Sequence, residues 1–133
     1  MSAQRFTVLI VEDEAALRRV LERALERDGH RVLSAASAET AYDLLASERA
    51  DAALLDVRLP TMSGLALYLA LIHRSPALVG RIAIMTGDAE AENVRAWVER
   101  NPCKVLRKPF DLREIVDWLR TVLDVPSRER GNA

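Results

Sequence analysis

Five short strand-like runs alternate along the chain with five segments of helical periodicity. The runs cover residues 6–11, 31–35, 52–55, 82–85 and 105–106. The first and third are almost continuously apolar, as expected of strands that are buried on both faces of a sheet. Strands that alternate with helices build a parallel sheet, and right-handed crossovers favour a doubly wound one. The sequence therefore predicts an α/β fold with a doubly wound five-stranded parallel sheet and five helices.

The helical segments lie at about residues 17–25, 37–45, 65–73, 94–98 and 111–123. In the first, apolar residues recur at helical spacing and charged residues fill the opposite face. Asp28 and Gly29 then end this helix. Ser37 is placed to cap the second helix. Asp111, with Glu114 three residues later, predicts a capping box at the start of the fifth.

Length and charge limit what the chain does. Its 133 residues suffice for one domain with a real core, and we expect an extension at residues 1–5, the domain at 6–123 and a flexible tail at 124–133. A net charge of −1 argues against nucleic-acid binding by bulk charge. A single cysteine fits a reducing compartment, and no apolar stretch is long enough to span a bilayer. We therefore expect a cytoplasmic protein with no membrane insertion.

Chemically useful side chains follow four of the predicted strands. Because the carboxyl ends of parallel strands meet at one edge of a sheet, we expect a shared site there, at the topological switch point. Its residues are Glu12, Asp13, Asp56, Thr86 and Lys108. Three adjacent carboxylates repel unless a cation neutralises them, and Mg²⁺ prefers oxygen ligands. With an ammonium and a hydroxyl they make the components of a phosphoryl-transfer site, in which Asp56 is a candidate nucleophile that forms an acyl phosphate.

Each of these residues taken alone has a simpler explanation. Asp13 or Glu14 can serve as a helix N-cap, and Asp56 can cap a loop. Thr86 and Lys108 can belong to ordinary loops at strand ends. The site interpretation depends on all of them falling at the same end of one predicted sheet.

Four stretches of the sequence resemble the receiver domain of two-component response regulators. They are residues 8–14 (VLIVEDE), 54–64 (LLDVRLPTMSG), 84–89 (IMTGDA) and 106–110 (LRKPF). An acidic pair, a central Asp, a Thr 30 residues later and a Lys-Pro with its Lys 22 residues further on form a specific signature in this order. The resemblance extends from about residue 7 to residue 123. It implies a flavodoxin-like sheet in the order 2-1-3-4-5.

The resemblance also implies how the acidic residues divide their work. Asp56 matches the phosphoacceptor, which takes a phosphoryl group from a histidine kinase or a phosphotransfer protein. It also matches a ligand of Mg²⁺. Asp13 matches a direct ligand of the ion, and Glu12 matches one that usually acts through water. Arg58 matches a position that supplies its backbone carbonyl to the metal.

Two further residues match the part of the family signature that responds to phosphorylation. Thr86 matches the switch hydroxyl, which moves to hold a phosphoryl oxygen. Lys108 matches the lysine that contacts the phosphoryl group, and its bond to Pro109 is usually cis in this family. The added charge rewards the conformation in which both reach it, which biases a two-state equilibrium toward a signalling state. The sequence does not name the downstream effector.

The sequence departs from the family pattern at Val105, where many receivers carry Tyr, Phe or His three residues before the lysine. We therefore expect a switch that works through the loop and helix around residues 87–92, without an aromatic rotamer. Arg58 and Asp88 lie two residues beyond the phosphoacceptor and the switch Thr. We expect them to overhang the site and to tune the lifetime of the acyl phosphate through water access. The alternative is two solvated loop charges.

Residues 64–72 carry no charge, although a surface helix normally has a polar face. Only one face can pack on the sheet, so we expect some of Leu69, Ile72 and Tyr68 to be exposed. An exposed apolar patch predicts a homodimer or a docking surface here. The alternative is a broadly buried helix with scattered exposed apolar residues.

Rival site classes fit less well. A dinucleotide-binding domain needs a Gly-rich turn after the first strand, where this chain has an acidic run. An aspartate-nucleophile phosphatase usually carries a second Asp at the position of Arg58. We predict a phosphoacceptor domain and no enzyme, although it promotes its own phosphorylation and dephosphorylation. A phosphorylation-independent receiver-like binding or dimerisation module is the alternative. No direct nucleic-acid binding is expected, because no second domain follows Leu123.

Overall fold

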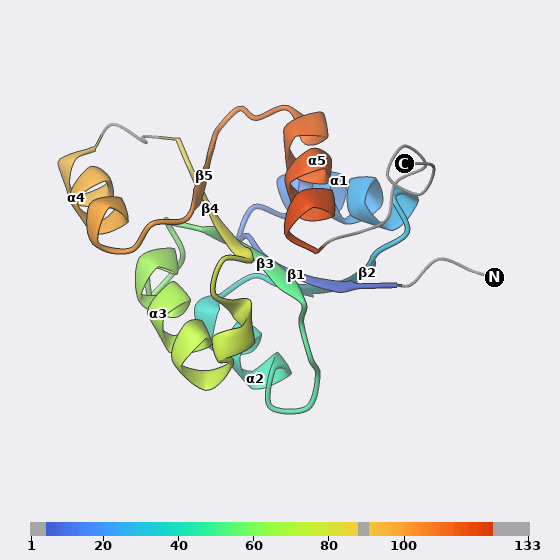
Figure 1. Cartoon of the computed structure of the whole chain (residues 1–133), viewed down its shortest axis with the longest axis horizontal. Coiled ribbons are helices and arrows are strands. Elements are labelled where there is room, and N and C mark those ends of the chain that lie inside the picture. The colour runs from blue at the N-terminus through green and yellow to red at the C-terminus, as the bar shows by residue number, and fades with distance from the viewer. Residues whose placement is uncertain (1–4, 88–90, 124–133) are drawn as a thin grey trace.

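The computed structural model describes residues 5–87 and 91–123 and contains one parallel sheet. Its strands are β1 (Thr7–Val11), β2 (Arg31–Ala35), β3 (Ala52–Asp56), β4 (Ile82–Thr86) and β5 (Lys104–Arg107). The helices are α1 (Ala15–Arg27), α2 (Ala38–Leu44), α3 (Gly64–Arg74), α4 (Glu92–Arg100) and α5 (Leu112–Val122), and a 3₁₀ turn, η1 (Pro76–Leu78), follows α3. The strands lie in the order β2-β1-β3-β4-β5 (Figure 1). The predicted doubly wound fold and its strand order are confirmed.

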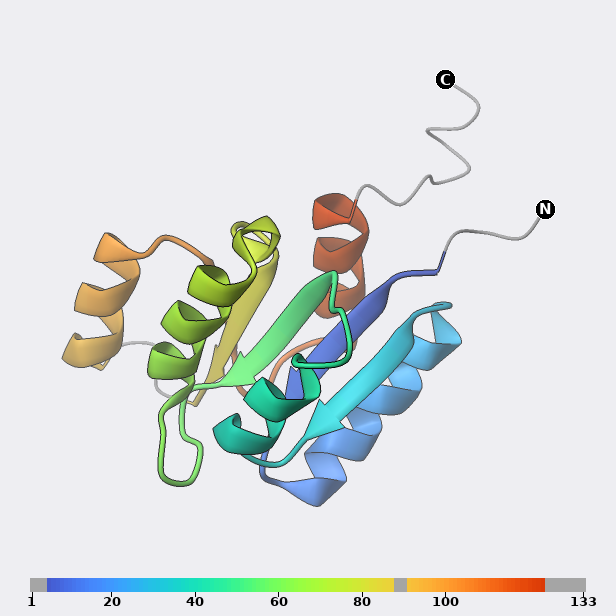
Figure 2. The ribbon, with the colours of Figure 1, turned by 90° about the horizontal axis from the view of Figure 1, so that it is seen from below.

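Helices cover both faces of the sheet: α1 and α5 pack on one face, and α2, α3 and α4 pack on the other (Figures 1 and 2). The sequence of β1 does not alternate between apolar and polar residues, because both faces of this strand are buried. Val8 and Ile10 point into the core under α1 and α5, whereas Leu9 and Val11 point into the opposite core. All four side chains are fully buried. None of the helices in the described part of the chain is long and apolar enough to cross a membrane.

Residues 1–4, residues 124–133 and Asp88 lie outside the described residues. The predicted domain boundaries and the predicted position of the Asp88 side chain therefore stay predictions.

The helix caps predicted from the sequence are only partly formed in the structure. The Ser37 side chain accepts a hydrogen bond from the amide of Thr40 and so caps α2, as predicted. At α5 the Asp111 carboxylate accepts from the amide of Arg113 at 2.9 Å. The predicted capping box is only half formed among the described residues, because the Glu114 carboxylate pairs with Lys104 of β5 at 3.1 Å.

One local expectation needs correction, and another is met by one of its three residues. Thr86 is the last residue of β4 and does not begin a loop, because the pairing of β4 with β5 continues through it. On α3, Leu69 is 44% exposed, but Tyr68 is only 4% exposed because its ring meets Trp97 of α4 edge-on, with ring centroids 4.9 Å apart. The prediction that some of Leu69, Ile72 and Tyr68 are exposed is thus met by Leu69, and a homodimer through this surface stays a prediction.

Candidate phosphoryl-transfer site

The five residues expected to form a site all lie at the carboxyl edge of the sheet. Glu12 and Asp13 follow β1, Asp56 ends β3, Thr86 ends β4, and Lys108 follows β5. β1 connects to β2 on one side, whereas the chain reaches β3 on its other side. The winding direction therefore reverses between β1 and β3, where an open α/β sheet leaves a crevice at its carboxyl end. The three carboxylates lie at this point.

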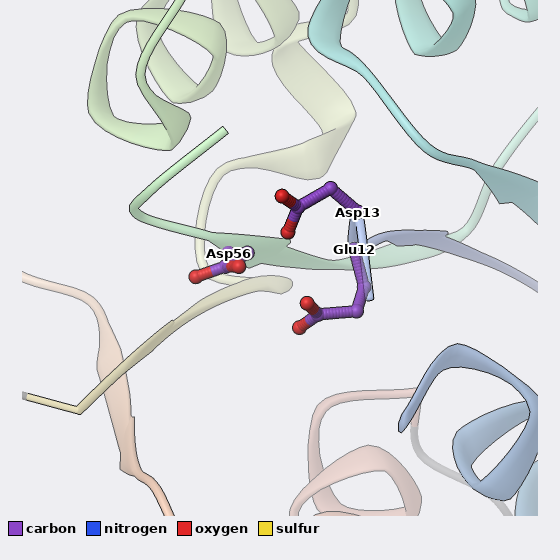
Figure 3. A group of neighbouring side chains, drawn as sticks. All are labelled: Glu12, Asp13 and Asp56. Atoms are coloured by element: carbon purple, nitrogen blue, oxygen red, sulfur yellow. The ribbon is translucent and has the colours of Figure 1, made fainter. Parts of the chain in front are cut away.

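The three carboxyl groups form a tight cluster. One carboxylate oxygen from each of Glu12, Asp13 and Asp56 lies within 4.8 Å of the others, and Figure 3 shows the three groups directed toward the same space. Glu12 and Asp56 are buried, at 1% and 5% exposure, whereas Asp13 is exposed. The cluster borders a cavity of about 530 Å³ that Arg58, Gly87 and Lys108 also line. An all-oxygen set with one open side suits a hard divalent cation such as Mg²⁺, which keeps several waters.

Lys108 supplies the positive charge at this site. Its Nζ lies 2.9 Å from Oε1 of Glu12 and 3.3 Å from Oδ2 of Asp56. Burial lowers the pKa of Lys108, but the hydrogen bond to Glu12 and the charge of Asp56 outweigh it and raise the pKa above its ordinary value. Burial, together with the charge of Asp56, raises the pKa of Glu12, although hydrogen bonds from Lys108 and from the amide of Glu14 lower it in part. Lys108 is therefore a permanent cation held between two buried carboxyl groups.

Main-chain amides fix two of the carboxylates. Oε2 of Glu12 accepts from the amide of Glu14 at 3.1 Å, and Oδ1 of Asp56 accepts from the amide of Arg58 at 3.2 Å. The loop-capping interpretation of Asp56 is thus confirmed, and it coexists with membership of the cluster. Glu14 occupies the N-cap position of α1, but its side chain makes no capping hydrogen bond within the described part of the chain. The side chain that bonds to the main chain there is that of Glu12, which accepts from the amide of Glu14.

Thr86 joins the site through its main chain, since its carbonyl accepts the amide of Lys108 at 2.9 Å. Thr86 is buried and lines a second cavity, of about 380 Å³, beside the acidic one. Arg58 is exposed and lines both cavities. The structure therefore brings five of the six predicted site residues around one cavity and places the sixth, Thr86, at the adjoining one.

The segment around Lys108 contains the peptide bond that the resemblance implies to be cis and the residue, Val105, that departs from the family pattern. The Lys108–Pro109 peptide is cis, as the resemblance implies. Val105 is half-buried and packs against the core on the α2–α4 face.

Two residues with a structural part in the site were missed by sequence reasoning. Arg18 of α1 donates a hydrogen bond from Nη1 to the main-chain carbonyl of Glu12 at 2.7 Å. Gly64 packs against the main-chain carbonyl of Asp56, so that a Cβ there would clash. Neither role was predicted, because a contact with the main chain of a distant residue is not visible in a one-dimensional pattern.

Comparison with known proteins gives one consistent family. The model for the response regulator receiver domain matches residues 8–120. The chain is similar to the sporulation initiation phosphotransferase F of Bacillus subtilis, at 29% identity over 90% of this chain and 95% of that protein. It is also similar to the phosphate regulon transcriptional regulatory protein PhoB of Pseudomonas aeruginosa, at 33% identity over 88% of this chain and 51% of that protein.

Solved structures agree with this assignment. A CheY-like response regulator receiver domain protein from Methanospirillum hungatei has a TM-score of 0.81 and 27% identity, covering 92% of this chain and 95% of that one. The chain spans between 16% and 51% of the length of the first curated relatives that it matches, which are larger proteins.

Proposed function

Because the chain belongs to the family of response regulator receiver domains, whose members accept a phosphoryl group in two-component signalling, we propose that Asp56 is its phosphoacceptor. The observation that carries this proposal is the position of Lys108, whose ammonium bridges Glu12 and Asp56 at the switch point of the sheet. A carboxylate with a fixed cation beside it is suited to receive an anionic group. The phosphorylation-independent binding module is not favoured, since the acidic pair, the central Asp, the Thr and the Lys are all retained.

In the proposed reaction a carboxylate oxygen of Asp56 attacks the phosphorus of a phosphohistidine. The O–P bond forms as the N–P bond breaks, and the imidazole leaves with the electron pair of that bond. The product is an acyl phosphate on Asp56. Lys108 already contacts this carboxylate, so its ammonium can exchange Glu12 for an oxygen of the transferred group and stabilise the charge there.

We propose that Mg²⁺ is held by Asp13, Asp56 and, through water, Glu12, with the main-chain carbonyl of Arg58. The ion supplies neutralisation of the negative charge on the transferred group. The chain's own contribution is to keep three carboxyl oxygens within 4.8 Å of one another, an arrangement whose repulsion a divalent cation relieves.

The proposed switch begins at Thr86. Phosphorylation adds a charge of about −1.5 to −2 and several acceptor oxygens at Asp56. Thr86, which lines the adjoining cavity, would move so that its hydroxyl donates to one of these oxygens, and the segment after β4 would move with it. Val105 has no ring to follow this movement, so the signal passes through that segment and α4. We propose that the downstream effector binds the surface around α4.

We further propose that the domain promotes hydrolysis of its own acyl phosphate and that Arg58 slows this reaction. The Arg58 side chain is exposed at the rim shared by the two cavities, where it limits the approach of water to Asp56. Arg58→Ala should therefore shorten the lifetime of the phosphorylated protein, followed by intact mass after removal of the phosphodonor. An unchanged lifetime would show that Arg58 is only a solvated loop charge.

The phosphohistidine must come from a kinase or phosphotransfer protein, and we propose that this partner docks beside Lys108. An apolar groove of about 630 Å³ lies there between α1 and the start of α5. Its apolar lining is Ala16, Leu17, Val20, Pro109, Phe110 and Leu112. Glu14 and Lys108 line both this groove and the acidic cavity. A protein seated in the groove would therefore reach Asp56 without crossing another part of the surface.

The chain's two lysines provide a test of the site. With a small phosphodonor such as acetyl phosphate and Mg²⁺, Lys108→Ala should slow phosphorylation about 100-fold, the effect of removing one preorganised charge donor. Lys104→Ala removes the other lysine, which lies on β5 and pairs with Glu114 of α5. This substitution should leave the rate unchanged. Equal rates for Lys108→Ala and the wild type would remove the support for this site.

A further inference from the structure

Arg18 reaches back from α1 to the loop that carries the acidic pair. Its Nη1 lies 2.7 Å from the main-chain oxygen of Glu12. That carbonyl belongs to the peptide that joins Glu12 to Asp13, the two acidic residues proposed above to bind Mg²⁺. Arg18 therefore contacts the peptide bond that joins the two proposed metal ligands, and not their carboxylates.

The guanidinium of Arg18 is itself held in place. Its Nε lies 3.9 Å from Oε2 of Glu22, one helical turn further along α1. The same Glu22 oxygen accepts a hydrogen bond from the Ser34 hydroxyl of β2. A chain of polar contacts thus runs from β2 across α1 to the Glu12–Asp13 peptide. Because guanidinium is planar and its donors have fixed directions, this support defines where the carbonyl must point.

Among the described residues, the Glu12–Asp13 peptide has few other supports. The amide of Glu12 donates to the carbonyl of Ala35 at 3.0 Å, which fixes the entrance to the loop. Beyond it, the Glu12 carboxylate and the amide of Glu14 bond to each other at 3.1 Å. The Arg18 contact lies between these two points. Rotation of this peptide would turn the Asp13 side chain away from Glu12 and Asp56.

We propose that Arg18 is a positioning residue that holds the Glu12–Asp13 peptide in the orientation that binds a divalent cation. This inference rests on the proposed function, because it concerns the same Mg²⁺ site. A competing effect has the opposite sign: a guanidinium charge near the carboxylates repels the ion, so that its removal would strengthen binding. The direction of change on substitution therefore separates orientation from charge.

The first test is titration of Mg²⁺ into the wild type, Arg18→Met, Arg18→Lys and Arg19→Met, measured by calorimetry. Arg18→Met should bind Mg²⁺ about tenfold more weakly, as is typical when a group that orients metal ligands is lost. Arg18→Lys keeps the charge and one donor and should recover part of the loss. Arg19→Met removes the neighbouring, exposed arginine and should bind as the wild type does.

The second test needs no metal. In metal-free Arg18→Met, the amide of Glu14 should exchange its hydrogen faster than in the wild type, because the loop that presents the Glu12 carboxylate is released. The amide of Glu12 in the same sample should keep its protection, because its bond to Ala35 is independent of Arg18. Unchanged protection of Glu14 would overturn the proposal, and so would equal loss at Glu12 and Glu14, which is the signature of general unfolding.

The outcomes also separate this inference from the proposed function. Mg²⁺ binding by the wild type with equal or tighter binding by Arg18→Met would overturn the role of Arg18 and leave the metal site intact. No Mg²⁺ binding by the wild type would overturn both.

Discussion

Gly64, the first residue of α3, lies directly against the main-chain carbonyl of Asp56. A Cβ at Gly64 would be 2.0 Å from that oxygen and 2.7 Å from its carbon. The amide of Gly64 donates to the carbonyl of Val57 at 2.9 Å, which holds the two segments together. Any side chain at position 64 must therefore push α3 away from the strand end that carries the proposed phosphoacceptor.

Gly64→Ala should lower the free energy of unfolding by about 3 kcal/mol, the upper range for overpacking of a well-packed site. Chemical denaturation measures this. Gly87→Ala is the matched control, because a Cβ there meets nothing within 4 Å and the backbone is not left-handed. It should be neutral or stabilising by up to about 1 kcal/mol. A Gly64→Ala protein as stable as the Gly87→Ala protein would contradict the close approach.

Thr61 has a left-handed backbone, with φ of 63°, in the loop between β3 and α3. This conformation is costly for a β-branched residue, and the Thr61 hydroxyl bonds to Glu39 of α2 and to the carbonyl of Pro60. Thr61→Gly and Thr61→Ala lose the same hydroxyl, but only Ala keeps the strain. The Gly variant should be more stable by about 1–2 kcal/mol.

The same pair of substitutions at Thr40, in the first turn of α2, should show the reverse order, with Ala more stable than Gly by up to about 1 kcal/mol. Thermal or urea unfolding of the four variants checks both signs. The same order at positions 40 and 61 would rule out a left-handed backbone at Thr61.

His30 gives the fold a predictable pH dependence. Burial lowers the pKa of His30 below its ordinary value of 6.5, and this outweighs the Asp28 carboxylate, which lies 3.5 Å from the imidazole and raises the pKa. Arg120, which pairs with Asp28, lowers it further. The folded state therefore binds a proton less readily than the unfolded state. Stability is full above pH 6.5 and falls as the pH decreases through the lowered pKa.

His30→Gln should remove this part of the acid destabilisation, measured as the free energy of unfolding between pH 7 and pH 5. His73→Gln should keep it, because this second histidine is exposed on α3. An acid response of His30→Gln that matches the wild type would show that His30 is not the responsible group.

The apolar groove beside Lys108 predicts a difference between two kinds of phosphodonor. Val20 is 47% exposed in this groove, and Val20→Asp should slow transfer from a phosphohistidine protein about tenfold or more. The rate with acetyl phosphate should stay the same, because that donor needs no docking surface. Val79→Asp, at an exposed position that lines none of the site cavities among the described residues, is the control.

An equal loss of rate with both donors in Val20→Asp would locate the effect in the acidic cavity. A rate with the protein donor that neither variant changes would mean that the donor docks elsewhere.

The fold was predictable mainly because the three central strands, β1, β3 and β4, are buried on both faces and so appear in the sequence as short apolar runs. Thr86 shows where this signal stops, since a hydroxyl at a strand end looks like the start of a loop until the pairing of β4 with β5 is known. The absence of charge on α3 predicted that some of Leu69, Ile72 and Tyr68 are exposed, but it did not show which of them, and Tyr68 is buried. Only tertiary packing brings Trp97 of α4 over its ring.

The acidic cluster was predictable from one topological rule, because the ends of parallel strands meet at one edge. The supports of the cluster were not. Arg18 bonds a main-chain carbonyl and Gly64 leaves room for another, and main-chain contacts leave no residue-type signature in a single sequence. Glu114 makes the same point in reverse: its spacing from Asp111 fits a capping box, but its carboxylate pairs with Lys104 of β5.

The central claim is that Asp56 accepts a phosphoryl group in a reaction that needs Mg²⁺. The most direct measurement is the intact mass of the wild type and of Asp56→Asn after incubation with acetyl phosphate, each with and without Mg²⁺. We expect the wild type to gain the mass of one phosphoryl group only when Mg²⁺ is present, and Asp56→Asn to gain none. A gain by Asp56→Asn equal to that of the wild type, or no gain by the wild type with Mg²⁺, would contradict the account.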